Sequence, residues 1–479
     1  MRLLASISTL VLALVAIPAH AREDERRAPD GALEIARELG LSDDERRPDD
    51  QLKLELFGHP LVIGGEIETE LQFRENYDLG TEDEGDDIQL AAEIKIEAVL
   101  LLDDDLVTYA EVKAGGERDL HRQGGGAGSE GEVQLSEAWV LKTGLFGTPL
   151  ALQVGRQQLQ DRREWWWDED LDMVRLHYFG RDVRGFVGVG RELGHYSTLG
   201  ARQPDERDIV RTVASVSWDW MDRQELHLYF LDRHDASPFE AIGARIGEDA
   251  VDEVDGDLTW LGVRLRGRVK ADFPGKFYYW GDFALLTGHE DELELDELPN
   301  GDAIVTGHSR NRARGWAFDV GASLELPFAF EPYLTLAYAR GSGGDETFRQ
   351  TGLHGNNGKL RGNARFRYYG EVLRPELSNL AIATVALGIP IGEDGWIETV
   401  WHDYRQVSAE DLLAGSRLDI DPEGLRRGIG QEFDIIASYR PPSGWDFELT
   451  GGVFRAGRAF GAARGEHAWQ VRANVTRNF

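Results

Sequence analysis

From Leu52 to the last residue, the chain repeatedly alternates apolar and polar side chains with a period of two. In residues 88–97, for example, Ile88, Leu90, Ile94 and Ile96 alternate with polar residues. Because successive side chains of a β-strand point to opposite faces, this pattern predicts strands with one apolar and one polar face. The alternation recurs in residues 66–74, 316–325, 432–440 and 469–479. We therefore expect an all-β, antiparallel fold.

Two closed sheets fit this alternation, and they differ in the solvent that each face meets. A soluble sandwich buries the apolar face, whereas an outer-membrane barrel turns that face towards lipid and lines a wet lumen with the polar face. The polar faces here carry charges of both signs, and the connections alternate between tight ones and long acidic ones, which favours the barrel. Residues 441–444 form a tight connection, and long ones are expected at residues 81–87, 248–257 and 290–297.

Aromatic residues gather near the ends of predicted strands, as in the interfacial girdles of membrane barrels. These clusters are Trp218 with Trp220, residues 278–280, and Tyr368 with Tyr369.

The string Trp165, Trp166, Trp167 is the most unusual in the chain, and we predict that it belongs to such a girdle at a strand end. Since adjacent strand residues point to opposite faces, at least one of these indoles is expected to face a loop or the lumen.

Residues 1–21 have the features of a secretory signal peptide. Arg2 supplies the positive charge, residues 3–17 are apolar, and Ala19-His20-Ala21 is a small-x-small cleavage site. Residues 22–50 are rich in charges of both signs and are expected to form a solvated periplasmic extension rather than a plug. Residues 51–479 are then expected to form a single-domain barrel in the outer membrane of a Gram-negative cell.

Composition excludes several classes of protein. The chain has no cysteine, so it cannot form disulfides, use a thiolate nucleophile or ligate zinc through sulfur. Its formal net charge of −34 argues against nucleic acid as a partner, because nucleic acid requires a basic surface. No catalytic or phosphate-binding motif is present, so we expect a protein that is not an enzyme and needs no cofactor. Calcium bound by acidic residues 249–257 is a weaker alternative, because EF-hand spacing is absent.

The mature chain, at roughly 25 residues for each strand and its connection, provides about 16–18 strands and encloses an aqueous channel. Guanidinium groups in such a channel bind carboxylates and stay charged at any relevant pH. The cations at inward positions of predicted strands are Lys95, Lys113, Arg175, Arg264, Arg266, Arg365, Arg367, Arg440 and Arg472. They either contact an anionic polymer or neutralise interior carboxylates such as Glu93, Glu371 and Asp434, and spacing supports both interpretations equally.

The second half of the chain contains several distinctive strings. They are GRQ at 155–157, LTWLG at 258–262, YARGSGG at 338–344, FRQTGL at 348–353, GEVLRPELSNL at 370–380, IGQEFD at 429–434, GGVFR at 451–455 and the terminal Phe479. In order and spacing, these strings resemble the alginate export family of outer-membrane porins over roughly residues 150–479.

This resemblance implies a monomeric barrel of 18 strands with an electropositive constriction, through which a polyuronate leaves the periplasm by diffusion without a cofactor. It also implies that the barrel-assembly machinery reads the terminal strand at Phe479, and that periplasmic export proteins are further partners. Arg365 and Arg374 occupy positions where the alginate exporter has lumen arginines. Two other such positions hold Ser136 and Gln158 here, so part of the selectivity filter differs.

We therefore predict an anion-selective export channel for an anionic, alginate-like polysaccharide. The predicted polymer contacts and pore-lining residues are Arg365, Arg367, Arg374, Arg156, Arg264, Arg266, Arg440, Arg472 and Lys95. One alternative is a general porin for small anions or oligosaccharides, which the mixed interior charges favour. A second is a membrane-anchored enzyme or binding protein that acts on exopolysaccharide, for which Glu164, Asp168 and Asp170 beside the tryptophans are the candidate carboxylates.

Overall fold

The computed structural model describes residues 51–81, 86–122, 128–161, 163–198, 208–236, 241–246, 254–270, 275–298, 303–359 and 366–479. The predicted signal peptide, residues 1–21, and the predicted extension, residues 22–50, lie outside the described residues. Among the described residues, no helix is long and apolar enough to cross a membrane.

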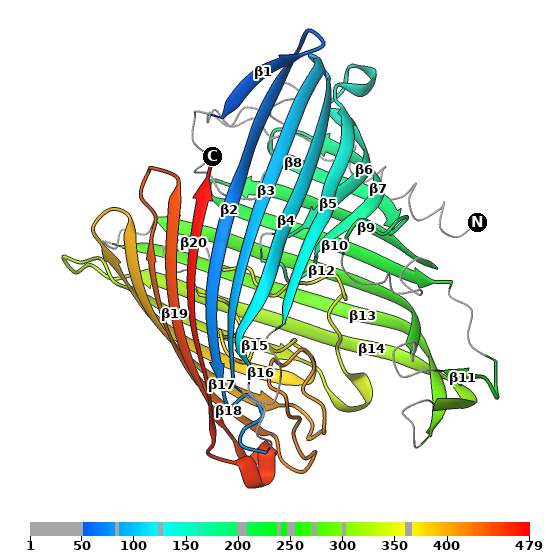
Figure 1. Ribbon diagram of the computed structural model, residues 1–479, viewed down its shortest axis with the longest axis vertical. Coiled ribbons are helices and arrows are strands. Elements are labelled where there is room, and N and C mark those ends of the chain that lie inside the picture. Colours follow the sequence, from blue (N-terminus) through cyan, green and yellow to red (C-terminus); the bar gives the residue numbers. More distant parts are fainter. Residues whose placement is uncertain are drawn as a thin grey trace.

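Eighteen antiparallel strands form one closed barrel, as predicted (Figure 1). The first nine are β2 His59–Glu75, β3 Asp87–Asp103, β4 Leu106–Arg122, β5 Ser129–Lys142, β6 Leu150–Gln160, β7 Asp168–Phe179, β8 Val183–Arg191, β9 Ile209–Met221 and β10 Gln224–Asp235. The other nine are β12 Val254–Lys270, β13 Lys276–Glu297, β14 Ala303–Glu325, β15 Tyr333–Gly341, β16 Leu380–Ile391, β17 Gly395–Gln406, β18 Gly428–Tyr439, β19 Trp445–Ala456 and β20 His467–Asn478.

The barrel closes where β2 pairs with β20, from Glu66 opposite Asn478 to Glu75 opposite Trp469. Figure 1 shows these first and last barrel strands side by side. Two short strands lie outside the closed ring: β1 Leu52–Leu56 pairs with the start of β2, and β11 Arg245–Ile246 pairs with the start of β14. The 3-10 helices that lie wholly within the described residues, η1 Leu145–Gly147, η4 Gly344–Glu346 and η5 Arg458–Ala463, lie in connections.

The two ends of the barrel differ in their connections. At the end that holds the start of β2 and the end of β20, which we call the turn end, the connections are short, as between β9 and β10 at Asp222 and Arg223. At the opposite end, which we call the loop end, β15 and β16 are joined by residues 342–379 and β17 and β18 by residues 407–427. In outer-membrane barrels the short turns face the periplasm and the long loops face outwards.

The predicted alternation of faces is confirmed along the strands. On β18, Phe433 and Ile435 are exposed on the outer face, whereas Glu432 and Asp434 are buried in the interior. Apolar side chains thus cover the outer face of the barrel and polar side chains line its inner face.

Two loop-end connections fold into the barrel instead of extending away from it. Residues 161–167, between β6 and β7, contact residues 342–379 through backbone hydrogen bonds such as that from Gly355 to the Glu164 carbonyl, 3.1 Å. Together they bury an interior cluster that includes Trp165, Trp166 and Phe348. The bore is therefore lined by these connections as well as by strands.

This inward folding corrects two predictions. Trp165, Trp166 and Trp167 are at most 3% exposed and pack inside the barrel, so the girdle prediction was wrong for them. Tyr368 and Tyr369 also belong to an inward connection, and Tyr369 is buried. Period-two patterns cannot reveal that a connection turns inwards, because its residues follow no strand phase.

A further correction concerns residues 290–297, predicted as a loop, which form the loop-end part of β13. These residues pair with β14 along their whole length. The acidic composition of the segment suggested a loop and did not indicate this strand pairing. The Trp218 and Trp220 prediction holds, because both lie exposed on β9 near the turn end.

Candidate functional site

Cationic side chains from two parts of the chain surround Glu371 inside the barrel. Arg367 and Arg374 flank Glu371 in the connection between β15 and β16, and Arg472 projects from β20. The distances from Glu371 Oε2 are 2.5 Å to Arg367 Nη1, 3.2 Å to Arg472 Nη2 and 3.6 Å to Arg374 Nη2. With the nearby Arg417 and Lys359, we call this set the lumen arginine cluster.

Glu432 on β18 holds the connection in this position. Its carboxylate accepts hydrogen bonds from three successive backbone amides, those of Glu371 at 2.6 Å, Val372 at 2.7 Å and Leu373 at 3.0 Å. The Tyr404 hydroxyl donates a fourth hydrogen bond to Glu432, at 3.1 Å. Carboxylates that accept several backbone N–H bonds bind them strongly, so the turn that carries Glu371 is fixed to the barrel wall.

Three carboxylates contact the lumen arginine cluster. Besides Glu371, Glu448 lies 3.5 Å from Arg472 and also bonds Lys359, and Glu70 lies 3.7 Å from Arg472. Although burial favours the protonated form of Glu371, the Arg367, Arg472 and Arg374 guanidinium groups lower its pKa to about 2. Among the described residues, the cations of the cluster thus outnumber the carboxylates that contact them.

Arg374 is only partly neutralised within the cluster. Its Nη1 donates to Asn357 at 3.1 Å, but its buried Nε and Nη2 have no hydrogen-bond partner among the described residues. Burial and the neighbouring charges of Arg367 and Arg417 lower the pKa of Arg374 well below its usual value. An incoming carboxylate that contacts the exposed part of this guanidinium would reduce this repulsion.

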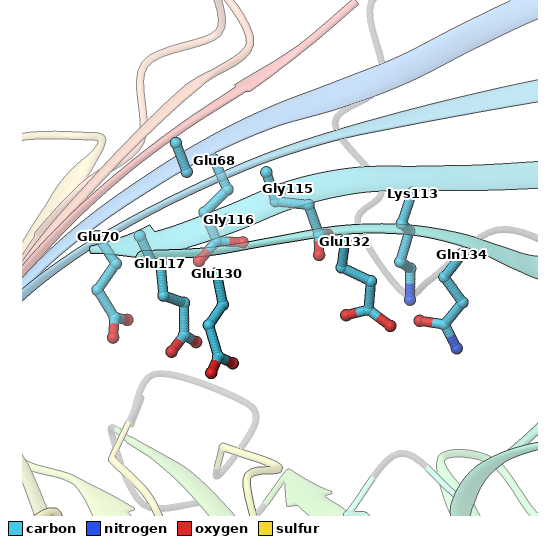
Figure 2. Close-up of a pocket in the computed structure, with 12 residues that line it drawn as sticks. Glu68, Glu70, Lys113, Gly115, Gly116, Glu117, Glu130, Glu132 and Gln134 are labelled. Atoms are coloured by element: carbon cyan, nitrogen blue, oxygen red, sulfur yellow. The ribbon is translucent and has the colours of Figure 1, made fainter. Parts of the chain in front are cut away.

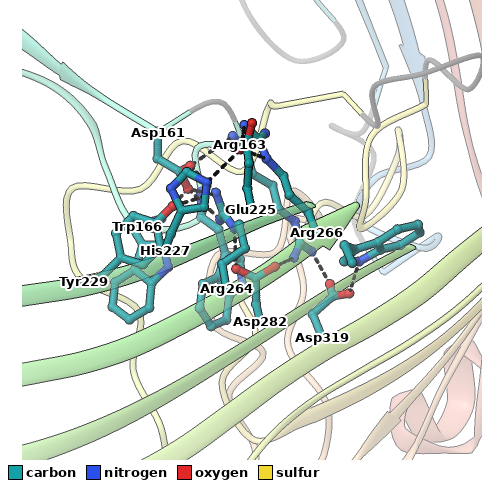
Figure 3. Close-up of polar contacts among 12 residues, drawn as sticks. Asp161, Arg163, Trp166, Glu225, His227, Tyr229, Arg264, Arg266, Asp282 and Asp319 are labelled. Carbon is teal, nitrogen blue, oxygen red and sulfur yellow. Dashed lines mark hydrogen bonds and ion pairs between the residues drawn. The ribbon is translucent and has the colours of Figure 1, made fainter. Parts of the chain in front are cut away.

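A second charged network ties the β6–β7 connection to the opposite strands (Figure 3). Arg163 Nη1 donates to Asp282 of β13 at 2.6 Å, and its Nη2 bonds Asp319 of β14. Its guanidinium also lies 3.8 Å from the Tyr368 ring. Arg264 of β12 bonds the same Asp282 through Nε at 2.5 Å.

Asp161 closes this network, because it accepts from Arg264 Nη2 at 2.8 Å and from Arg264 Nη1. Although burial opposes ionisation, Arg264 lowers the pKa of Asp161. Every N–H-bearing nitrogen of Arg264 is therefore used within the protein. We call Asp161, Arg163, Arg264, Asp282 and Asp319 the charged brace.

A cavity of about 450 Å³ lies along the inner face of β2 to β5 (Figure 2). Glu68 and Glu93 are directly opposite each other across β2 and β3, and Glu117 and Glu130 are opposite across β4 and β5. Glu70 lines this cavity and also contacts Arg472, so the acidic wall begins beside the lumen arginine cluster. The lumen thus has one cationic and one acidic region.

The structure brings three of the predicted site residues together and separates the others. Arg367, Arg374 and Arg472 meet in the lumen arginine cluster, and Arg264 belongs to the charged brace. Arg365 lies outside the described residues.

The remaining predicted residues lie on the wall or at the turn end. Arg266 donates to Glu225 at 2.7 Å, and Arg156 packs 4.3 Å above the Tyr196 ring. Lys95 of β3 lies opposite Glu66 and Lys113 on the inner face. Arg440 follows the end of β18 and pairs with Asp446 at the turn end.

The other inward cations have local partners. Lys113 lies 3.7 Å from Glu111, and Arg175 donates to the Gln158 carbonyl at 2.9 Å. Ser136 is fully buried. Of the carboxylates expected to neutralise the lumen, Glu371 does contact the arginines, whereas Asp434 lies 3.8 Å from His402.

Sequence reasoning missed Arg163, Lys359 and Arg417. All three lie in connections, where no strand phase marks a residue as inward-facing. For Arg163, the one available signal in the sequence was its position two residues before the three tryptophans.

Comparison with known proteins identifies relatives over most of the chain. The family described as Alginate export matches residues 59–474. The alginate production protein AlgE of Pseudomonas aeruginosa is 26% identical over 350 residues, which are 68% of this chain and 70% of that protein. The crystal structure of Acinetobacter baumannii OccAB2 has a TM-score of 0.55 at 10% identity, covering 87% of this chain and 98% of that one. The outer membrane protein OprD of Pseudomonas aeruginosa has a TM-score of 0.51 at 11% identity, covering 87% of this chain and 93% of that one.

Proposed function

Because the chain belongs to the alginate export family, we propose that this outer-membrane barrel exports an anionic polysaccharide of the alginate type. The observation that carries the proposal is the lumen arginine cluster, in which the cations outnumber the carboxylates that contact them among the described residues. A polyuronate has one carboxylate on every sugar, so it can pair with these cations in succession as it moves.

The polymer contacts are Arg374, Arg367 and Arg472, with Arg365 of the same connection as a further contact. Glu371 neutralises part of their charge, which keeps each contact with a passing carboxylate weak enough to break. The acidic wall of β2 to β5 repels the same polymer and confines it to the cationic side of the lumen. Arg264 has a positioning role, because its donors are occupied within the charged brace.

Export in this proposal is passive and involves no catalytic step or cofactor. Residues 1–21 direct the chain to the periplasm and are removed, residues 22–50 remain as a periplasmic extension, and the barrel works as a monomer. The barrel-assembly machinery recognises the last strand with Phe479, and periplasmic export proteins deliver the polymer to the turn end.

Planar-bilayer conductance of the refolded barrel tests this proposal. We expect anion selectivity and a block by polymannuronate but not by neutral dextran of equal length. In the double variant Arg374→Gln and Arg472→Gln, the reversal potential should shift towards cations and the blocking concentration should rise about tenfold. Arg223→Gln, in the β9–β10 turn, is the control and should behave like the wild type.

Two results would contradict the proposal in different ways. A double variant that is blocked like the wild type would place the filter elsewhere in the lumen. A wild-type barrel that is cation-selective or unaffected by polymannuronate would instead indicate a general porin for small solutes.

A further inference from the structure

The outer face of the barrel changes from apolar to cationic towards the loop end. On β14 the outward-facing side chains run from Val320 through Phe318 and Trp316 to Arg314 and Arg312. On β15, Tyr338 is followed by Arg340 on the same face, since alternate residues of a strand share a face. The apolar part lies where lipid chains are expected, so these arginines lie at the outer boundary of the membrane.

The strands β17 and β19 repeat this change. Trp401 on β17 is followed by Arg405, and Val453 on β19 is followed by Arg455. The strand register places Arg340 opposite Ala381 of β16 and Ala381 opposite Arg405, so two arginines are separated by one small side chain. We call Arg312, Arg314, Arg340, Arg405 and Arg455 the outer arginine group.

These arginines, unlike those of the lumen, lack carboxylate partners. No ion pair or side-chain hydrogen bond within the described residues involves Arg312, Arg314, Arg405 or Arg455, and all four are exposed. Arg340 packs 5.6 Å above the Trp316 ring and has a buried Nε without a hydrogen-bond partner. The exposed donors of Arg312, Arg314, Arg405 and Arg455 are therefore accessible to an acceptor on another molecule.

Acidic residues on the same face are few and already engaged. Asp291 of β13 lies 3.7 Å from Arg310, the next outward residue of β14 after Arg312. Asp403 of β17 accepts a hydrogen bond from Gln431 at 3.0 Å. The turn end differs, because exposed outer residues there are aromatic or aliphatic, such as Ile391 of β16, Tyr439 of β18 and Trp445 of β19.

We propose that the outer arginine group binds the phosphate groups of the phosphorylated glycolipid in the outer leaflet. Guanidinium groups form bidentate hydrogen bonds with phosphate, and the adjacent Trp316, Tyr338 and Trp401 contact the acyl chains of the same lipid. The arginines lie outside the pore, so the proposal holds whatever solute the pore carries.

Lipid binding to the purified barrel in detergent, followed by native mass spectrometry, tests the inference. The probe is diphosphoryl lipid A, compared with its dephosphorylated form and with inorganic phosphate as a competitor. Replacing Arg312, Arg314, Arg405 and Arg455 by Gln should raise the Kd for diphosphoryl lipid A at least about tenfold. The matched control, Arg223→Gln with Arg477→Gln, removes two charges at the turn end and should bind like the wild type.

The possible results either overturn the proposal or distinguish lipid-bound phosphate from free phosphate. Unchanged affinity in the fourfold variant, or equal binding of dephosphorylated lipid A, would overturn the proposal. Displacement of lipid A by inorganic phosphate at equal concentration would show a site for free phosphate rather than for lipid. If the fourfold variant does not refold, the pairs Arg312→Gln with Arg314→Gln and Arg405→Gln with Arg455→Gln provide the same comparison. Pore conductance should stay unchanged in all of them, which separates this test from that of export.

Discussion

Glu371 is the residue on which the charge balance of the lumen depends. Its carboxylate lies within 3.6 Å of guanidinium groups from Arg367, Arg374 and Arg472. These arginines repel one another, and Glu371 is the anion that all three share. A neutral side chain at this position therefore changes both the stability of the barrel and its selectivity.

The variant Glu371→Gln should be more anion-selective and less stable than the wild type. Removing one partner from a buried charge cluster costs about 3–5 kcal/mol, because the remaining charges stay buried without compensation. Reversal potentials and guanidinium-induced unfolding measure the two effects. Glu346→Gln changes an exposed carboxylate of the same connection and should alter neither. An unchanged reversal potential in Glu371→Gln would mean that ions do not pass the lumen arginine cluster.

The stability of the inward connections should depend on pH through Glu164. Burial and the neighbouring Asp168 carboxylate raise the pKa of Glu164 from 4.5 to about 7. The folded chain then binds more protons than the unfolded chain between these values, so stability falls as the pH rises through that window. In Glu164→Gln, the decrease in melting temperature between pH 5 and pH 8 should be smaller. An equally steep decrease in that variant would assign the pH dependence to other groups.

At the scale of elements, the charged brace fixes the β6–β7 connection across the lumen. Arg163 links this connection to β13 and β14, and Asp161 links it to β12 through Arg264. The connection also carries the tryptophans that pack against Phe348 of the β15–β16 connection, with 6.2 Å between the Trp165 and Phe348 rings. The charged brace thus fixes the β6–β7 connection, and the β15–β16 connection with its arginines packs against it.

Replacing Arg163 by Met should lower the free energy of unfolding by about 3–5 kcal/mol, because Asp282 and Asp319 lose a buried partner. Single-channel recordings should also become noisier as the two connections move. The matched change Arg266→Met breaks a half-exposed pair with Glu225 and should cost only about 0–1 kcal/mol. Equal losses in the two variants would show that the brace contributes no more than a surface ion pair.

The whole molecule depends on the closure between β2 and β20. Gly65 and Phe479 exchange two backbone hydrogen bonds there, of 2.9 and 3.0 Å. A Cβ atom on Gly65 would lie 2.2 Å from the Lys95 carbonyl oxygen and 2.7 Å from Phe479 Cζ. Glycine is therefore required where the first barrel strand meets the last residue.

Gly65→Val should reduce the fraction of barrel that assembles in the outer membrane, because the side chain prevents close approach of the two strands. Gly451→Val is the control, since a Cβ atom at Gly451 has no neighbour within 4 Å. Heat-modifiable migration on semi-native gels measures the assembled fraction. Normal assembly of Gly65→Val would show that β20 can close the barrel in another register.

The sequence was sufficient to predict the barrel, the faces of the five segments with clear alternation and the uneven connections. Phe433 and Glu432 show why, because lipid and lumen impose opposite polarity on neighbouring residues of one strand. It also placed Arg264 and Arg472 on the inner face. It also named Glu371 as a neutralising carboxylate but could not pair it with Arg472, and it did not reveal Asp161 as the partner of Arg264. Both acids belong to connections whose path is set by packing across the barrel. For the same reason the interior location of Trp165, Trp166 and Trp167 could not be derived.

The hydrogen bonds that Glu432 accepts from three main-chain amides determine which parts of this segment can change. Those hydrogen bonds are made with the backbone of Glu371, Val372 and Leu373, so they do not depend on which side chains those positions display. Mutation can alter the residues around this turn, Arg374 among them, while the turn itself stays anchored. Substitutions in this segment can therefore change the side chains in the lumen while the backbone keeps its place against the barrel wall.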